Sequence, residues 1–331
     1  MTPDVSRPVV AEPVNVFITG ADGFIGRALA TRLRDLGCQV TGVDLKADPG
    51  HGVAGGSTTD PSDWADALDG VDVVIHTAAI VSNAASRDQA WEVNVRGTRR
   101  VLDAAEAHGV RRFVHLSSVA AYGFDFPDNV DETYPIRVNG FSYTETKVNS
   151  EAVVLAAHGA GEIECTIIRP VDVYGPGSVP WVVLPLQMIK KGQMLLPNGG
   201  RGIFSPVYID NFVDGMVLAI SSDGAAGQIF ILGDGYGVSC SDYFGRLASM
   251  AGGKVRTLPT GIAIAIANVI GFTQRRLGQA SELNAATMLM LSRPGTYSID
   301  KARKVLGFEP LVSYDEGMRR VETWARAEGL I

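Results

Sequence analysis

Residues 14–26 read VNVFITGADGFIG. The run from 14 to 19 is apolar and β-rich, and glycines follow it at positions 20, 23 and 26. This pattern is typical of a buried strand that turns directly into a helix. The first glycine permits the tight turn, the second lets the backbone approach a pyrophosphate, and the third lets the helix pack on the strand. Because the first turn of a helix has free N–H groups and a partial positive charge, the stretch predicts a phosphate-binding loop.

Asp44 stands at the end of the next expected strand, residues 39–43. A carboxylate at this place accepts hydrogen bonds from both hydroxyls of a cofactor ribose and repels a 2′-phosphate. The sequence therefore favours NAD over NADP, although Lys46 would soften that preference. The alternative interpretation of Asp44 is an aspartate in a solvated turn.

Strands and helices alternate along the first half of the chain. Beyond the first two strands and the helix that ends near Gly37, we expect strands at 71–76, 112–117 and 164–169 and helices at about 87–108 and 144–158. The alternation predicts the α/β class, with a Rossmann-type doubly wound parallel sheet.

The pattern changes after Pro170, where prolines and glycines interrupt it, and the last third is mostly helical. We therefore expect a flexible N-terminal tail at 1–13 and an NAD-binding domain at 14–170. A smaller, mostly helical substrate lobe at 171–331 would be interleaved with the sheet domain.

Composition excludes several classes of protein. The 331 residues are 46% hydrophobic, which is enough for a packed core, and the net charge is −7, whereas nucleic-acid binders usually carry a basic surplus. The cysteines, at 38, 165 and 240, are far apart and predict small buried residues in a reduced, cytoplasmic protein. The histidines show no metal-ligand spacing, so we expect no metal site.

The longest apolar run is 261–272, GIAIAIANVIGF. It is too short to cross a bilayer, so we expect no integral membrane segment. We favour a buried helix or a pocket wall over a helix that lies on a membrane surface. Arg275 and Arg276 follow the run and keep the second alternative open.

Tyr143 and Lys147 are spaced to lie one helical turn apart on one helix face. A phenol with an ordinary pKa of about 10 is a poor base at neutral pH. A nearby ammonium lowers the pKa of the phenol, and a nicotinamide cation helps in the oxidative direction. Ser117 and Ser118 come at the end of the strand 112–117, where a hydroxyl can hydrogen-bond a substrate oxygen. With the glycine loop and Asp44, these residues predict a hydride-transfer site.

The motifs together resemble the extended short-chain dehydrogenase/reductases, and most closely their 3β-hydroxysteroid dehydrogenase and dihydroflavonol reductase branch. The resemblance covers nearly the whole chain and rests on TGADGFIG (19–26), Asp44, HTAA (76–79), VNVRGT (93–98), SSVAAYG (117–123), YTETK (143–147), IIRPVDVYGPG (167–177) and the tail 299–317. These motifs are specific for fold and cofactor, and weak for substrate.

The resemblance implies a role for each motif. Tyr143 would be the general acid and base, Lys147 would bind the nicotinamide ribose and tune Tyr143, and Ser118 would be the catalytic serine. Asn94 would hold strand and helix ends together near the cofactor. The cofactor-binding residues expected on this basis are Gly20, Asp22, Gly23, Phe24, Ile25, Gly26, Asp44, Ser57, Thr58, Ala78, Ala79, Asn94, Ser117, Tyr143, Lys147, Pro170 and Val171.

Two positions depart from relatives that act on nucleotide sugars. Those relatives have an asparagine and an arginine that hold a diphosphate where this chain has Asp172 and Phe204. An aspartate would repel a diphosphate and a phenylalanine cannot pair with one. Arg293 matches a second diphosphate arginine, so the pattern is mixed but leans away from nucleotide sugars. At the adenine site, Ser57 stands where many relatives have an aspartate.

The expected pocket segments, 181–184, 203–204 and 261–272, are apolar, which favours an apolar substrate, although ordinary core packing explains them equally well. The substrate-contacting residues expected are Ile80, Ala120, Asp172, Trp181 and Phe204.

Three hypotheses for function follow. The first is an NAD-dependent oxidoreductase acting on a secondary alcohol or ketone, steroid- or flavonol-like. The second is a nucleotide-sugar 4-epimerase with tightly bound NAD. The third, a redox-sensing protein that binds NAD without chemistry, is disfavoured because Tyr143 and Lys147 are both present. The partners expected for the protein are a small-molecule substrate and a second copy of the chain. The resemblance implies a homodimer in which helices near 88–107 and 144–158 pair with those of the second copy.

Overall fold

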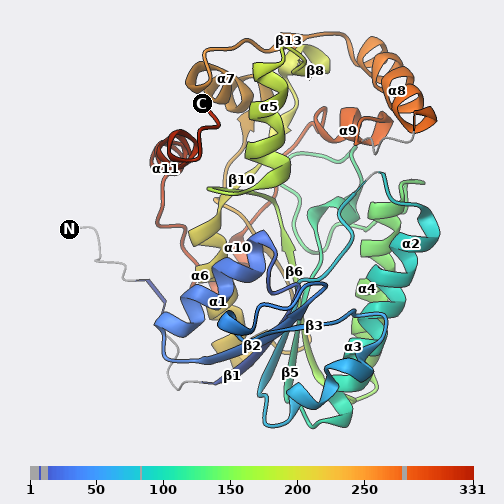
Figure 1. The fold of residues 1–331 in the computed structure, drawn as a ribbon, viewed down its shortest axis with the longest axis vertical. Helices are drawn as coiled ribbons and strands as arrows, with labels where there is room; N and C mark the ends of the chain where they lie inside the picture. The colour runs from blue at the N-terminus through green and yellow to red at the C-terminus, as the bar shows by residue number, and fades with distance from the viewer. Residues whose placement is uncertain (1–6, 9–13, 83, 278–281) are drawn as a thin grey trace.

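A seven-stranded parallel sheet forms the centre of the molecule (Figure 1). The computed structural model describes residues 7–8, 14–82, 84–277 and 282–331. The sheet order is β11 (Ile229–Leu232), β6 (Glu164–Pro170), β5 (Arg112–Leu116), β4 (Val73–His76), β1 (Asn15–Thr19), β2 (Gln39–Asp44) and β3 (Val53–Gly55). The α/β class and the doubly wound parallel sheet are confirmed.

Helices cover both faces of the sheet, which explains why its strands lack polar alternation. All four residues of β4 are buried. In Figure 1, α1 (Phe24–Asp35) and α6 (Ile209–Ser221) lie on one face, and α3 (Thr98–Ala107) and α4 (Ser142–Gly159) lie on the other. A short α2 (Arg87–Trp91) and a π-helical stretch (Glu92–Gly97) lead into α3.

The remaining elements build a lobe beyond the carboxyl ends of the strands (Figure 1). Its helices include α5 (Leu184–Lys190), α7 (Cys240–Met250), α8 (Thr260–Arg276) and α9 (Ala285–Met290), and α10 (Asp300–Leu306) and α11 (Tyr314–Ala327) complete the chain. Three two-stranded sheets link it: β7 (Asp172–Tyr174) with β10 (Pro206–Tyr208), β9 (Ile203–Phe204) with β12 (Val238–Ser239), and β8 (Leu195–Leu196) with β13 (Arg256–Thr257).

The sheet order reverses between β1 and β4, because the chain builds outward from β1 to β3 and then returns. In a doubly wound sheet, this reversal opens a crevice at the carboxyl ends of the strands, where ligands bind. The loops after β1, β2, β4, β5 and β6 all reach this edge, and so carry most of the expected site residues.

Residues after 170 also contribute to the sheet domain, since β11 pairs with β6 and α6 packs beside α1. Most of the tail expected at 1–13 lies outside the described residues. Arg7 is described, and its guanidinium donates to Asp214 of α6 at 2.7 Å. All three cysteines are buried and unpaired, as expected.

The apolar face expected to support dimerisation is largely used within one chain. Ala90, Thr98, Val101 and Leu102 are each at most 2% exposed. Val101 and Leu102 pack in the hydrophobic cluster between the sheet and α3. The homodimer therefore stays a prediction.

The run 261–272 lies in α8, and its described residues contradict the favoured expectation of a buried helix. Ile262, Val269 and Phe272 are 51%, 64% and 54% exposed. Ala263 and Ala267, in contrast, are buried. Within the described ranges, no helix has both the length and the apolarity needed to span a bilayer.

Two buried histidines join the sheet to the helices on one face. His76, at the end of β4, contacts Thr19 Oγ1 at 2.7 Å and Thr98 Oγ1 of α3 at 3.0 Å. His115 of β5 contacts Ser150 Oγ of α4 at 2.9 Å. Burial lowers the pKa of His76 to about 3 and that of His115 well below its ordinary value, so both rings are neutral in the folded protein.

These histidines predict a loss of stability in acid. Below the ordinary pKa of 6.5, these two imidazoles bind protons in the unfolded chain but stay neutral in the folded protein. The free energy of unfolding therefore falls as the pH drops from 6.5 towards 3. Each histidine should contribute up to ~1.4 kcal/mol per pH unit. Denaturant unfolding of His115→Gln at pH 7 and pH 5.5 should show a smaller acid loss than wild type. Equal losses in the two proteins would contradict the prediction.

Candidate active site

The glycine loop after β1 has the geometry of an anion cradle. Gly20 has φ +70°, and a Cβ there would lie 2.9 Å from the Ala78 nitrogen, so only glycine fits without strain. A Cβ at Gly26 would lie 2.2 Å from the Gly20 oxygen, because the helix and the turn touch at this point. Helix α1 begins with no side-chain cap at Gly23 and no acidic residue in its first turn, which leaves its N–H groups free for a ligand.

Asp44 is held beside this loop. Its carboxylate accepts hydrogen bonds from the Asp22 backbone nitrogen at 2.9 Å and from the Leu45 nitrogen at 2.7 Å. Oxygen lone pairs remain for further donors, since each carboxylate has about four acceptor positions. The Asp22 carboxylate forms an ion pair with the Arg27 guanidinium at 2.6 Å, on the exposed side of the start of α1.

Asn94 connects the end of β4 to α4. Its amide group accepts from the Ile80 nitrogen at 2.7 Å and donates to the Ile80 oxygen and to Thr146 Oγ1, both at 3.0 Å. Because Thr146 directly precedes Lys147, this side chain fixes the start of α4 to the loop that carries Ala78 and Ala79.

The three expected catalytic residues come together. Ser118 follows β5 and lies close enough to Tyr143, in the first turn of α4, to lower the pKa of its phenol. The Lys147 Nζ atom lies 5.9 Å from the centre of the Tyr143 ring and donates to the Leu116 carbonyl oxygen at 2.6 Å. The phenol, the hydroxyl and the ammonium therefore share the end of β5.

The pKa of Tyr143 differs from the expectation. Burial raises the pKa of its phenol above the ordinary value, and the hydrogen bond with Ser118 only partly opposes this. The expected lowering by Lys147 is not met in the chain alone, where burial of the phenol dominates and Lys147 has no resolved effect on this pKa. The phenol is thus protonated at neutral pH.

Glu151 was not foreseen from the sequence. It lies four residues after Lys147 on α4, and its charge partly offsets the burial that lowers the Lys147 pKa to about 8. Arg169 of β6 forms a buried pair with Glu151 at 2.6 Å and donates to the Tyr122 hydroxyl at 2.7 Å. The spacing Lys147–Glu151 is the signal that would have revealed it.

Several expected cofactor residues are engaged within the protein. The Ser117 hydroxyl donates to Glu151, so this side chain supports α4. The Ser57 hydroxyl contacts Thr59 Oγ1 at 2.8 Å, and Thr58 is buried. Val171, which continues from Pro170 at the end of β6, donates its N–H to the Leu232 oxygen at 3.1 Å.

The expected substrate residues divide into two groups. Asp172 is buried and pairs with Arg293, so its charge is compensated and does not by itself repel a diphosphate, contrary to expectation. Phe204 is fully buried and stacks on Tyr243 with ring centres 3.8 Å apart, which places it in the core. Trp181, Ile80 and Ala120 are partly exposed.

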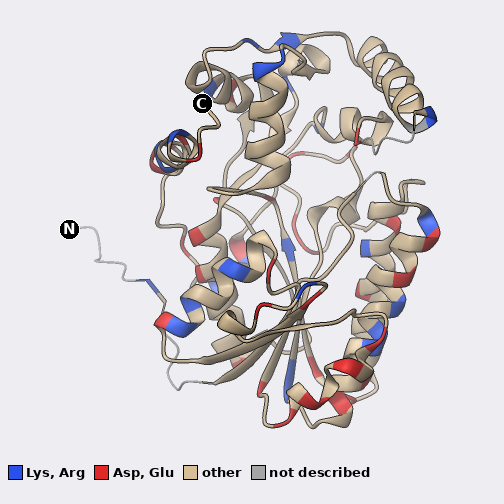
Figure 2. Ribbon diagram, viewed as in Figure 1, with Lys and Arg blue, Asp and Glu red and all other residues tan. Residues whose placement is uncertain are grey.

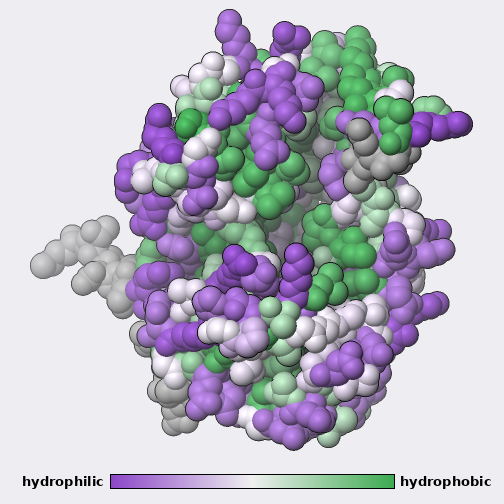
Figure 3. All heavy atoms as spheres, viewed as in Figure 1, coloured by the Kyte–Doolittle hydropathy of each residue, from purple (hydrophilic) through white to green (hydrophobic). Residues whose placement is uncertain are grey.

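A hollow separates the lobe from the sheet domain in Figure 3, and hydrophobic side chains border it. Exposed apolar residues also lie between elements of the chain: Val81 after β4, Val138 before α4, and Val179 before α5. The sequence did not single these residues out, because an exposed apolar residue in a loop has no periodic signal.

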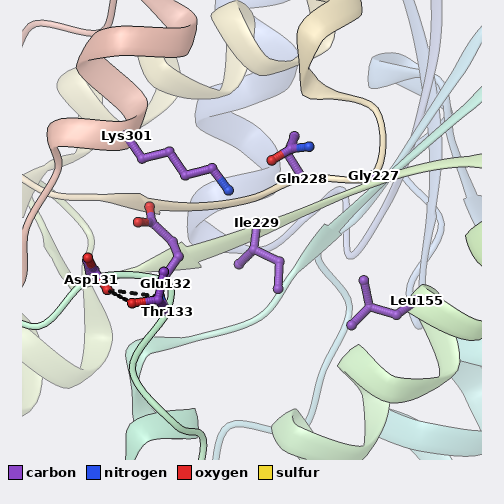
Figure 4. Close-up of a pocket in the computed structure, with 8 residues that line it drawn as sticks. All are labelled: Asp131, Glu132, Thr133, Leu155, Gly227, Gln228, Ile229 and Lys301. Atoms are coloured by element: carbon purple, nitrogen blue, oxygen red, sulfur yellow. Dashed lines mark hydrogen bonds between the residues drawn. The ribbon is translucent and has the colours of Figure 1, made fainter.

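A separate cavity of about 390 Å³ lies beside the edge strand β11 (Figure 4). Glu132 and Lys301 point toward one another across it. Glu132 accepts a hydrogen bond from the Ile231 nitrogen of β11 at 2.8 Å, which satisfies an N–H of the edge strand and gives Glu132 a structural role. Among the described residues, no group of His, Cys, Asp and Glu is arranged to hold a metal ion.

Comparison with known proteins agrees with this geometry. Residues 16–233 match the model of the NAD dependent epimerase/dehydratase family. The chain is 32% identical to a 3 beta-hydroxysteroid dehydrogenase/Delta 5→4-isomerase of Mycobacterium tuberculosis, over 92% of this chain and 88% of the relative. It is 29% identical to a 4-hydroxy-2-methyl-3-oxo-4-farnesyl-3,4-dihydroquinoline-1-oxide ketoreductase of Stigmatella aurantiaca, over 92% and 95%.

A solved short-chain dehydrogenase/reductase superfamily protein from Agrobacterium tumefaciens, with bound NAD, has a TM-score of 0.75 and 26% identity, and the match covers 95% of this chain and 98% of that one. The family match spans more than half of the chain and includes the glycine loop, Asp44 and the Tyr143 site. The chain therefore belongs to the NAD dependent epimerase/dehydratase family, as its resemblance to the extended short-chain dehydrogenase/reductases predicted.

Proposed function

We propose that the protein is an oxidoreductase that uses NAD to interconvert a secondary alcohol and a ketone on an apolar substrate. The observation that carries the proposal is the convergence of Tyr143, its partner Ser118 and the buried ammonium of Lys147 at the end of β5. This end of the strand opens on the same edge of the sheet as the glycine loop.

Tyr143 acts as the general acid and base. During reduction it donates its proton to the carbonyl oxygen, and during oxidation it takes the proton from the hydroxyl. Ser118 hydrogen-bonds the same oxygen, and Lys147 stabilises the phenolate left after proton donation. A bound nicotinamide supplies or accepts the hydride. Since burial keeps Tyr143 protonated, the chain is prepared for reduction before any ligand arrives.

The cofactor is held by the glycine loop and Asp44. The free N–H groups at the start of α1 receive the pyrophosphate, and Asp44 accepts from the hydroxyls of the adenosine ribose. A 2′-phosphate would meet the Asp44 carboxylate, so NAD is preferred to NADP.

The substrate is large and apolar, steroid- or prenyl-like. Two relatives are named for a hydroxysteroid and for a farnesylated ketone. Hydrophobic side chains border the hollow between the lobe and the sheet domain (Figure 3), and Val81, Val138 and Val179 are exposed apolar residues. Arg293, the residue that matches a diphosphate ligand in nucleotide-sugar enzymes, is engaged by Asp172, which disfavours the epimerase alternative.

Turnover should depend on Tyr143. With sterols and long-chain secondary alcohols, the wild type should form NADH, read by its absorbance, and Tyr143→Phe should lose about 10²–10⁴-fold in kcat while keeping its affinity for NAD, because only the acid/base step is lost. Tyr236→Phe, at an exposed tyrosine, is the matched control and should keep full activity. Undiminished turnover in Tyr143→Phe would refute the mechanism, and turnover of a nucleotide sugar without net NADH would favour the epimerase instead.

Asp44 should decide the cofactor. Asp44→Asn keeps an acceptor for the Asp22 N–H but removes the negative charge, so the ratio of kcat/KM with NADP to that with NAD should rise roughly ten-fold or more. Asp48→Asn, on the same connection but paired with His51, is the control and should leave the ratio unchanged. A ratio that does not move in Asp44→Asn would reject this assignment.

A further inference from the structure

Helix α8 has most of its large apolar residues on the outside, and Ile264 alone among its isoleucines packs partly buried against the core. Its buried positions are small, namely Ala263, Ala267 and Gly271, which are spaced four residues apart and form one face. Ile262, Ile266, Val269, Ile270 and Phe272 are all between 37% and 64% exposed, and Leu277, just past the helix, is 75% exposed. A helix that served only to cover the lobe would bury its isoleucines and expose its alanines, because burial of the larger side chains is the more favourable.

These residues form a continuous apolar surface. At 100° per residue, the exposed positions of α8 cover one side of the helix, opposite the alanines. Figure 3 shows the hydrophobic side chains gathered over α8 at the upper right of the molecule. Large exposed apolar patches on water-soluble surfaces usually mark a site of interaction.

The surroundings of this surface are basic. Between Asp172 and Asp210, and again between Asp242 and Glu282, the sequence has no acidic residue. These two segments supply α5, β8, β13 and α8. The exposed basic residues that these segments contribute to the lobe are Lys190, Lys191, Lys254, Arg256 and Arg276, and Figure 2 shows basic positions at the top of the lobe and at the end of α8. None of these five forms an ion pair with a carboxylate in the described part of the chain.

This charge runs against that of the whole molecule, which is −7. A partner that binds this end of the lobe through its charge must therefore be anionic. The partner must also offer an apolar environment for isoleucine, valine and phenylalanine side chains. A second copy of the chain fits poorly, because a two-fold contact would bring the same basic surface against itself. A bilayer with anionic lipids supplies both negative headgroups and an apolar interior.

We propose that α8 and the basic residues around it form a membrane-docking surface that binds anionic lipid bilayers peripherally. The helix lies in the plane of the interface with Ile262, Ile266 and Val269 inserted, and the lysines and arginines contact lipid phosphates. The docking surface lies on the substrate lobe and includes none of the residues assigned to the Tyr143 site, so it stands independently of the proposed function.

Vesicle flotation of the full-length protein tests the proposal. The protein should float with vesicles that contain half phosphatidylglycerol and half phosphatidylcholine, and should remain at the bottom with pure phosphatidylcholine vesicles. Raising the salt concentration should weaken the binding, because the attraction of exposed charges is screened. Lys190→Gln and Lys254→Gln should each weaken it about five-fold.

Val269→Asn tests the apolar part of the surface. It should reduce binding to the anionic vesicles at least ten-fold, whereas Val305→Asn, at an exposed valine of α10, is the matched control and should bind like wild type. Circular dichroism and NAD binding of each variant report whether the fold is intact.

Failure of the wild type to float with anionic vesicles would overturn the proposal. So would equal binding to both kinds of vesicle with no effect of the lysine substitutions, since the basic residues would then have no part in it. Self-association through α8 is the competing outcome. In that case neither wild type nor Val269→Asn will bind vesicles, and the variant will have a lower mass by light scattering, which would assign the surface to a second copy.

Discussion

The buried ammonium of Lys147 is the constraint on which the site depends. An isolated charge inside a protein costs several kcal/mol unless it is paired and hydrogen-bonded. The structure meets this cost with the Leu116 carbonyl at 2.6 Å, one residue before the Ser117–Ser118 pair, and with the negative charge of Glu151 one turn further along α4. Since Leu116 ends β5, the ammonium fixes the start of α4 against the end of that strand.

This one attachment positions the other parts of the site. Tyr143 lies one turn before Lys147, so it is brought over the same strand end, where Ser118 meets it. Glu151 is held in turn by Arg169 of β6, which extends the buried polar network to the neighbouring strand. A network of this kind is stabilising only when each member is satisfied, which explains why so many of these residues are engaged within the protein.

The sequence was sufficient for what local patterns encode. Several features are encoded within a few consecutive residues, and the fold class follows from them. They are the glycine loop, Asp44, the five longer strands in the first half of the chain, and the YxxxK spacing. The pairing of Asp172 with Arg293 could not be foreseen, because 121 positions separate the two residues and the ion pair depends on the folded lobe. The sequence predicts Phe204 as a pocket residue, but its stacking partner Tyr243 comes from helix α7, 39 positions further along the chain. Helix α8 was correctly placed, yet which of its faces is buried depends on the packing of the lobe.

The proposed mechanism requires the Lys147 charge to stabilise the Tyr143 phenolate once NAD is bound, since burial alone keeps the phenol protonated. The most direct test is a titration at the tyrosinate absorbance band, as the difference between wild type and Tyr143→Phe, repeated in the Lys147→Met background with NAD bound in each case. Removal of the ammonium should raise the pKa of Tyr143 by about one unit or more. A pKa of Tyr143 that is the same with lysine and with methionine would contradict it.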